Sequence, residues 1–305
     1  MALVATLIPE ASPKAGSKIG KVKDHYHGLA WPAPAKINLF LHVLGKRPDG
    51  YHNLQTVFQF LDYRDELFFE LNNLGSVSRY YDLGFSESDD LCLRAAHMLK
   101  EYAPQQYGVA IDLVKRLPMG GGLGGGSSNA ATVLLALNSL WKLGLSREKL
   151  AEIGLALGAD VPVFVMGQSA WAEGVGEQLS PIELNEPWYV VLNPQISVST
   201  AQVFANKHLT PALEMKKIRA LEKGIDSSFG ENQLEAIVRA EYPQVNNLIE
   251  WLGEYGQPRM SGSGASVFMP VPNQQTGLDI LAKQPSYSIG FVAKGLNSHP
   301  LLNVV

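Results

Sequence analysis

The sequence of 305 residues is poor in several features that would indicate a specialised class of protein. Cys92 is its only cysteine, which excludes a disulfide framework and a cysteine-rich metal site. The chain has no apolar run long enough to cross a bilayer, and its apolar first residues lack the basic segment of a secretory signal. A net charge of −4 and an isoelectric point near 6.0 argue against general nucleic-acid binding. We therefore expect a cytoplasmic protein without a nucleic-acid or membrane partner.

The length and the composition indicate two globular domains. At 305 residues, with 46% hydrophobic and 18% charged residues, the chain exceeds what one ordinary core accommodates. Residues 1–30 carry lysines and glycines without sustained periodicity, and are predicted to be a flexible extension or a cloning remnant. Regular patterns follow, and a polar stretch with two prolines interrupts them at 180–187. We predict domains at 31–180 and 181–305.

Hydrophobic patterns predict a mixture of strands and helices. Alternation in 36–43 places Lys36 and Asn38 on one face of a half-buried strand. Further strands are predicted at 51–61, 65–71, 109–115, 188–194 and 290–297, and a glycine turn leading into a strand is predicted at 258–271. Helices are predicted at 88–102, 127–144 and 146–158, each with a serine cap, and at 200–208 and 232–256. Residues 159–167 are predicted as a loop and a short apolar strand. Because strands and helices do not alternate steadily, we predict an α+β fold rather than a doubly wound sheet.

A run of glycines between a predicted strand and a predicted helix indicates an anion site. Six of the seven residues in 120–126 are glycine. Missing side chains let a phosphate approach the backbone, and the helix N-terminus offers unpaired N–H groups. Lys115 and Arg116 add positive charge, while Ser127 and Ser128 could donate hydroxyl groups or bind Mg²⁺.

Two familiar phosphate sites fit this run poorly. No Gly-Lys-Ser/Thr closes the run, so it is not a Walker A loop. Glycines 120, 122 and 125 do form G-x-G-x-x-G. A dinucleotide site, however, needs a second strand ending in an acid about twenty residues further on. The sequence places the predicted helix 146–158 there instead.

Three segments together resemble the motifs of the GHMP kinases, a family of small-molecule kinases. They are "PAKINLFLHV" at 34–43, "PMGGGLGGGSS" at 118–128 and "MSGSGASVF" at 260–268. The resemblance implies an N-terminal ribosomal-protein-S5-like domain, a C-terminal ferredoxin-like domain and an active site in the cleft between them. It also implies ATP as the phosphoryl donor and Mg²⁺ as the ion bound to ATP. Ser127 or Ser128 could bind this ion, and the motifs leave its other ligands open.

The same resemblance assigns roles around the phosphate. It implies that Asp160 is the catalytic carboxylate and that Lys36 keeps it ionised and stabilises the developing alkoxide. Asn38 would contact the same hydroxyl group. Gly262 and Gly264 would line the cleft from the C-terminal domain. The residues implied to hold ATP are Lys115, Pro118, Gly120, Gly121, Gly122, Leu123, Gly124, Gly125, Gly126, Ser127 and Ser128.

Further stretches, "RPDGYHNLQTVFQFLDY", "LGADVPVF" and "FVAKG", resemble GHMP kinases whose alcohol substrate carries cytidine diphosphate. Tyr51 and Phe204 would sandwich the base, a neutral His52 would hydrogen-bond its edge, and Thr200 would lie nearby. The implied acceptor is the 2-hydroxyl of a cytidine-diphosphate-linked methylerythritol, in non-mevalonate isoprenoid precursor synthesis. A different alcohol such as homoserine or a sugar, and a nucleotide-binding regulator without activity, stay open as alternatives. We expect a monomer or a weak homodimer.

Overall fold

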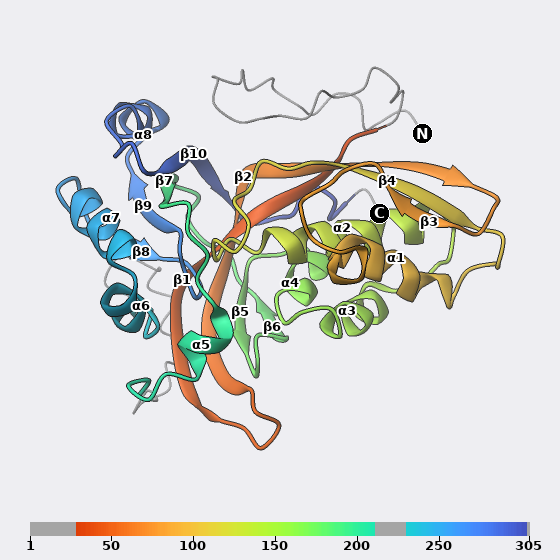
Figure 1. Cartoon of the computed structure of the whole chain (residues 1–305), viewed down its shortest axis with the longest axis horizontal. Helices are drawn as coiled ribbons and strands as arrows, with labels where there is room; N and C mark the ends of the chain where they lie inside the picture. Colours follow the sequence, from red (N-terminus) through yellow and green to blue (C-terminus); the bar gives the residue numbers. More distant parts are fainter. Residues whose placement is uncertain (1–28, 211–229, 304–305) are drawn as a thin grey trace.

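The computed structural model of the chain describes residues 29–210 and 230–303. Within these ranges, ten strands form one mixed sheet with the main order β3-β4-β2-β10-β7-β9-β8, shown in Figure 1. β1 and β5 pair with β2, and β6 pairs with β5. The strands are β1 (Trp31–Lys46), β2 (His52–Asn72), β3 (Val77–Arg79), β4 (Gly108–Val114), β5 (Ala170–Glu173), β6 (Gln178–Pro181), β7 (Trp188–Asn193), β8 (Arg259–Met260), β9 (Val267–Val271) and β10 (Ile289–Leu296). Helices pack beside this sheet, so the predicted α+β class is confirmed.

The helices gather in two groups (Figure 1). One group lies below β2, β3 and β4, and the other lies beside β7 to β10. Within the described ranges, no helix has both the length and the apolar character that crossing a membrane requires. The helices are the 3-10 helix η1 (Glu87–Asp89) and α1 (Leu91–Lys100), α2 (Gly125–Leu140), α3 (Arg147–Leu155), α4 (Val161–Met166), α5 (Thr200–Phe204), α6 (Glu235–Glu241), α7 (Pro243–Gly253) and α8 (Gln274–Leu281).

The long antiparallel ribbon of β1 and β2 joins the two groups. Its register runs from Trp31 opposite Leu67 to Lys46 opposite His52. The prediction of separate strands at 51–61 and 65–71 is wrong, because β2 continues through both. Its polar residues are accommodated: Asp62 accepts a hydrogen bond from the Lys294 backbone at 2.7 Å, and Asp65 is buried in an ion pair. Residues 36–43 are buried on both faces, so the half-buried prediction is also wrong.

Serine caps were predicted for the helices around the glycine run, and only one of them is present. Ser146 caps α3 by accepting from the Lys149 backbone N–H. Asp90 caps α1 instead of a serine, since its carboxylate accepts from two backbone N–H groups of the first turn. Gly124 takes the cap position of α2, because that helix starts two residues earlier than predicted. The apolar residues of α2 lie in the main core, so this helix is buried.

The prediction of a strand after Asp160 is wrong, because residues 161–166 form helix α4. The valines there favour a strand locally. Pro162 in the first turn is compatible with a helix start. Val163 and Phe164 have no exposed surface in the core shared with α2 and α3. Tertiary packing therefore overrides the local preference and places Asp160 at the beginning of a helix.

The second half of the chain follows the predicted pattern more closely. β7, β9 and β10 form where strands were predicted, and α6 and α7 divide the predicted helical segment 232–256. The sequence analysis missed α8 and the β5–β6 hairpin. The strand β10 pairs with both β7 and β2, so one sheet continues across the predicted boundary at 180–181, which stays a prediction. Residues 1–28 of the predicted extension lie outside the described residues.

Candidate active site

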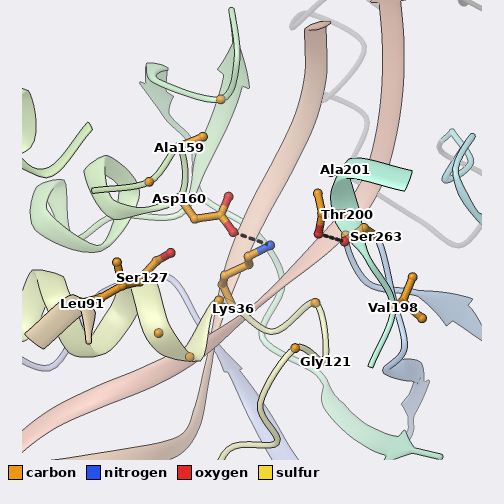
Figure 2. Close-up of a pocket in the computed structure, with 18 of the residues that line it drawn as sticks. Lys36, Leu91, Gly121, Ser127, Ala159, Asp160, Val198, Thr200, Ala201 and Ser263 are labelled. Atoms are coloured by element: carbon orange, nitrogen blue, oxygen red, sulfur yellow. Dashed lines mark hydrogen bonds and ion pairs between the residues drawn. The ribbon is translucent and has the colours of Figure 1, made fainter. Parts of the chain in front are cut away.

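A cavity of about 1040 Å³ lies where β1, β2, the starts of α2 and α4, and α5 meet. Its wall includes the glycine loop, by which we mean residues 118–126, and the glycine turn, residues 261–264. Every site residue predicted from the sequence lines this cavity except Arg116, Leu123 and Ser128. Figure 2 shows Lys36 and Asp160 pointing toward each other, with Ser127 on one side and Thr200 and Ser263 on the other.

The charged pair at the centre of the cavity is built by two elements distant in sequence. Lys36 on β1 lies 3.1 Å from Asp160, from its Nζ to Oδ2. The lysine side chain is only 3% exposed, whereas that of Asp160 is 32% exposed. Asp160 precedes α4 at the cap position, yet its carboxylate turns to the ammonium. The pair thus presents a carboxylate to the cavity and keeps the cation behind it.

Asn38 holds the ammonium in place. Lys36 Nζ donates to Asn38 Oδ1 at 2.6 Å, and Asn38 Nδ2 donates to Thr56 Oγ1 at 2.9 Å. Thr56 donates in turn to the Phe40 carbonyl oxygen. All of these side chains are buried. Asn38 was predicted to contact the acceptor hydroxyl group, which stays a prediction; the contacts above give it a second task, the orientation of Lys36.

The glycine loop packs so closely that two of its glycines leave no room for a side chain. A Cβ on Gly122, at a φ of +75°, would lie 2.1 Å from the Ser261 carbonyl oxygen. A Cβ on Gly124, at a φ of +70°, would lie 2.9 Å from the Phe164 ring and 3.1 Å from Lys36 Cε. Both the conformation and the close contacts therefore require glycine. The loop is pressed against the glycine turn and against Lys36.

Backbone hydrogen bonds fix this loop to the rest of the site. The Lys36 N–H donates to the Leu123 carbonyl at 3.0 Å, so Leu123, although outside the cavity wall, ties the loop to β1. Ser261 donates its hydroxyl to the Gly122 carbonyl at 2.8 Å. The Ser266 N–H donates to the Gly121 carbonyl at 3.0 Å. The loop is thus held in one shape by strands from both parts of the sheet.

The two serines at the start of α2 differ in position. Ser127 lines the cavity near the loop, as predicted. Ser128 does not, and the prediction that it contacts phosphate or metal disagrees with this geometry. Since α2 begins at Gly125, Ser128 faces the core and has no exposed surface. Among the described residues, its hydroxyl has no hydrogen-bond partner.

The two basic residues before the loop also differ. Lys115 lines the cavity and forms an ion pair with the carboxylate of Asp65, a fully buried residue of β2. Arg116 points away, pairing with Glu66 at 2.9 Å, so its predicted contribution to the anion site is not supported. Sequence reasoning missed Asp65, because its partners lie about fifty positions away along the chain.

Aromatic side chains form the end of the cavity nearest the tip of the β1–β2 ribbon. The rings of His52 and Phe204 are stacked, with centroids 5.3 Å apart at 29°. Tyr51 also lines the cavity and is 62% exposed. Burial, aided by the charge of Lys46, lowers the pKa of His52 below its usual value, which favours the neutral imidazole expected from the sequence. The base sandwich of Tyr51 and Phe204 stays a prediction.

Thr200 and Ser263 close the cavity between its two ends. Their hydroxyl oxygens lie 2.7 Å apart, which joins the start of α5 to the glycine turn. Gly262 lies against Asn38, since a Cβ there would be 3.3 Å from Asn38 Oδ1. Both predicted glycines of this turn line the cavity.

An apolar compartment beyond the glycine loop was not predicted. It is lined by Leu83, Phe85, Leu91 and Leu113. The sequence carries no motif for this compartment. Its walls come from a loop, a helix start and a strand, and apolar residues in such elements are common because they also pack in the core.

Comparisons with known proteins agree with this geometry. The family model described as GHMP kinases N terminal domain matches residues 90–168, and the one described as GHMP kinases C terminal matches residues 209–284. The 4-diphosphocytidyl-2-C-methyl-D-erythritol kinase of Thiobacillus denitrificans is 51% identical over 277 residues, which cover 90% of this chain and 98% of that protein.

Solved structures extend the likeness to the fold. The crystal structure of a 4-(cytidine 5'-diphospho)-2C-methyl-D-erythritol kinase has a TM-score of 0.75 at 32% identity, covering 88% of this chain and 99% of that one. A mevalonate kinase, with a TM-score of 0.64 at 14% identity over 88% of this chain and 100% of the other, shares the fold alone.

Proposed function

The chain belongs to the GHMP kinase family, and from this membership and the site geometry we propose its reaction. It transfers the γ-phosphoryl group of ATP to the 2-hydroxyl of 4-diphosphocytidyl-2-C-methyl-D-erythritol, a step of non-mevalonate isoprenoid precursor biosynthesis. The observation that carries this proposal is the Lys36–Asp160 pair, 3.1 Å apart, beside a glycine loop in which Gly122 and Gly124 leave no space for a side chain.

ATP fits the part of the cavity around the glycine loop. The backbone of the loop and the N-terminus of α2 offer N–H groups and partial positive charge to phosphate oxygens. Lys115 and the Ser127 hydroxyl line the same space. The apolar compartment described above adjoins the loop and would accommodate the adenine ring.

The residues present also fit a magnesium ion that accompanies ATP. Within the described ranges, no group of three or more His, Cys, Asp and Glu side chains could hold a metal. Mg²⁺ commonly keeps several waters and binds through substrate phosphates and one or two protein oxygens. Ser127 lines the cavity with a hydroxyl oxygen and would hold the ion together with water and phosphate oxygens. When bound, the ion would neutralise charge on the phosphate oxygens.

The transfer itself requires orientation of the acceptor and stabilisation of charge. The Asp160 carboxylate would accept the hydrogen bond, and then the proton, of the substrate hydroxyl. Lys36 favours the ionised form of this carboxylate and would stabilise the negative charge that develops on the oxygen. Asn38 fixes the direction of the Lys36 ammonium.

The length of the cavity favours a cytidine-bearing substrate over homoserine or a monosaccharide. Lys36 lies 5.2 Å from the Phe58 ring, whereas the aromatic end is at His52. Phe58 and His52 are both on β2, and the six positions between them span about 20 Å along a strand. A small alcohol at Asp160 would leave the aromatic end unused. An extended cytidine diphosphate group linked to a four-carbon alcohol would occupy both ends.

An ATP-consumption assay with purified protein tests the proposal. We expect turnover with 4-diphosphocytidyl-2-C-methyl-D-erythritol and Mg²⁺, and little with mevalonate, homoserine or galactose at the same concentration. Phosphorylation of homoserine with comparable catalytic efficiency would contradict the assignment of the substrate. Binding of ATP without turnover of any of these alcohols would favour the regulator.

The proposals for the location, the oligomeric state and the partners of the enzyme rest on the sequence alone. We propose that it acts in the cytoplasm as a monomer or a weak homodimer, without a nucleic-acid or membrane partner. Light scattering after size-exclusion chromatography measures the mass directly, and a stable assembly larger than a dimer would contradict this.

A further inference from the structure

A buried carboxylate lies directly beneath the entrance of the glycine loop. Asp65 on β2 has no exposed surface. Its Oδ1 accepts from the backbone N–H groups of Arg116 and Leu117 at 2.7 and 2.8 Å. Its Oδ2 accepts from Asn129 Nδ2 at 2.9 Å and pairs with the Lys115 ammonium. One side chain therefore connects β2, the end of β4, the loop entrance and helix α2.

This arrangement is costly unless the contacts serve a purpose. Removing a carboxylate from water carries a desolvation penalty that its partners must offset. An apolar residue at this position of β2 would pack without that penalty. The carboxylate is instead fully engaged, and two of its partners, Lys115 and Asn129, line the cavity.

The most mobile of these partners is Lys115. A lysine side chain is flexible and carries a compact charge, so its ammonium group can occupy many positions. Here the ammonium is held against the first residue of α2, since a Cβ on Gly125 would lie 2.9 Å from Lys115 Nζ. Asn129 Oδ1 lies 3.4 Å from the same ammonium.

We propose that Asp65 is a positioning residue for ATP: it fixes the Lys115 ammonium and the loop entrance in the geometry that receives the nucleotide. The inference rests on the proposed function, because it assumes that ATP occupies the glycine loop. Asp65 acts through Lys115 and does not touch the substrates.

The test is a double-mutant cycle with Asp65→Asn, Lys115→Met and the double variant. Asparagine keeps an oxygen for the two backbone N–H groups but presents an amide to Lys115, so it breaks one side of the network only. The readouts are the Kd of a non-hydrolysable ATP analogue by calorimetry and the KM of the cytidyl substrate. Glu66→Gln is the matched control, since Glu66 is the next residue of β2 and pairs with Arg116 outside the cavity.

We expect Asp65→Asn to raise the Kd of the analogue about tenfold, as loss of a charge-assisted hydrogen bond would. The KM of the cytidyl substrate should stay within twofold, a separation that general destabilisation would not produce. The double variant should bind no more weakly than Lys115→Met alone, and Glu66→Gln should match the wild type. Should Asp65→Asn not fold, Asp65→Glu keeps the charge but displaces it by one methylene group, and the same selective weakening is expected.

Three outcomes overturn the inference. A Kd for Asp65→Asn within twofold of the wild type means that Lys115 needs no such partner. Effects that simply multiply in the double variant mean that Asp65 acts independently of Lys115. If the wild type itself fails to bind the analogue, the proposed function falls together with this inference, whereas the first two outcomes leave the proposed function intact.

Discussion

The two ends of the cavity are built in opposite ways. At the phosphate end, Lys36, Asn38 and Asp65 are buried, and their polar contacts reach elements far away in sequence. At the base end, His52 and Phe204 are only half-buried and Tyr51 is largely exposed. The tip of the β1–β2 ribbon and the five-residue helix α5 carry these rings.

This difference follows from the tasks of the two ends. Charge stabilisation in a transition state requires groups that are already oriented, because reorientation during the reaction costs free energy. A flat base is recognised by stacking, which tolerates adjustment of the rings. Substitutions at the phosphate end should therefore lower kcat or weaken ATP, and substitutions at the base end should raise the KM of the cytidyl substrate alone.

The largest expected effect comes from Asp160→Asn. An amide cannot take the proton of the acceptor hydroxyl, so kcat should fall roughly 10²- to 10⁴-fold. Binding of an ATP analogue should change little, because the loop and α2 are untouched. Steady-state kinetics and calorimetry measure the two effects. Asp279→Asn on α8, an exposed carboxylate outside the cavity, is the control. A kcat within tenfold of the wild type would refute the role of Asp160.

Asn38→Leu should have the next largest effect. Leucine keeps the branching at Cγ but removes the acceptor for Lys36 Nζ and the donor to Thr56. Loss of a hydrogen bond to a charged group is worth about 1.5–3 kcal/mol, so kcat should fall roughly 10- to 150-fold. Thr56→Val, one step further along the chain of hydrogen bonds, should lose less. If instead the KM of the cytidyl substrate rose and kcat were unchanged, Asn38 would be a binding residue only.

The sequence predicted the glycine loop better than it predicted the residues that hold the loop in place. The run of glycines leaves a local pattern, so the loop was found directly, whereas the role of Lys36 was implied only by the family resemblance. Asp65 leaves none, since the contacts that define it come from β4 and α2. The prediction for Ser128 was wrong for a related reason. Because α2 starts two residues earlier than predicted, the Ser128 hydroxyl faces the core instead of the cavity.

The fold shows the same division between local and distant causes. Alternation located β1, and apolar segments of strand length located β4, β7 and β10. The valines of α4 indicated a strand because local preference is all that a short segment displays, and the packing against α2 and α3 that decides otherwise is not visible there. The polar face and internal glycine of α8 concealed a helix, although Asn273 caps it. The base end had to be inferred from family resemblance, since exposed aromatics carry no distinctive pattern.

At the base end, Phe204→Ala should raise the KM of the cytidyl substrate with little change in kcat. A stacked base contributes about 1–3 kcal/mol, which corresponds to roughly 5- to 150-fold. The matched control is Phe291→Ala, because Phe291 stacks on Tyr63 at 3.8 Å in a pair that does not line the cavity. Titration of both substrates separates the effects. A rise in the KM of ATP as well would mean that the two ends are not independent.

The smallest expected effect is a dependence on pH that His52 imposes on the base end. Burial, and then the charge of Lys46, lower the pKa of His52 below 6.5. The folded protein therefore holds the neutral ring at pH 7, and the unfolded chain takes up the proton first as the pH falls. Any stability that His52 contributes is present above pH 6.5 and is lost below it.

Recognition of the base should follow the same window. The KM of the cytidyl substrate should be constant from pH 8 to 6.5 and rise a few-fold below, as the imidazolium loses its acceptor nitrogen. Lys46→Met should move this rise to higher pH, because it removes one of the two causes of the shift. His52→Asn should abolish the rise. A KM that stays flat to pH 5 in the wild type would show that the base is held by the aromatic rings without the imidazole, and would reduce the base end to stacking alone.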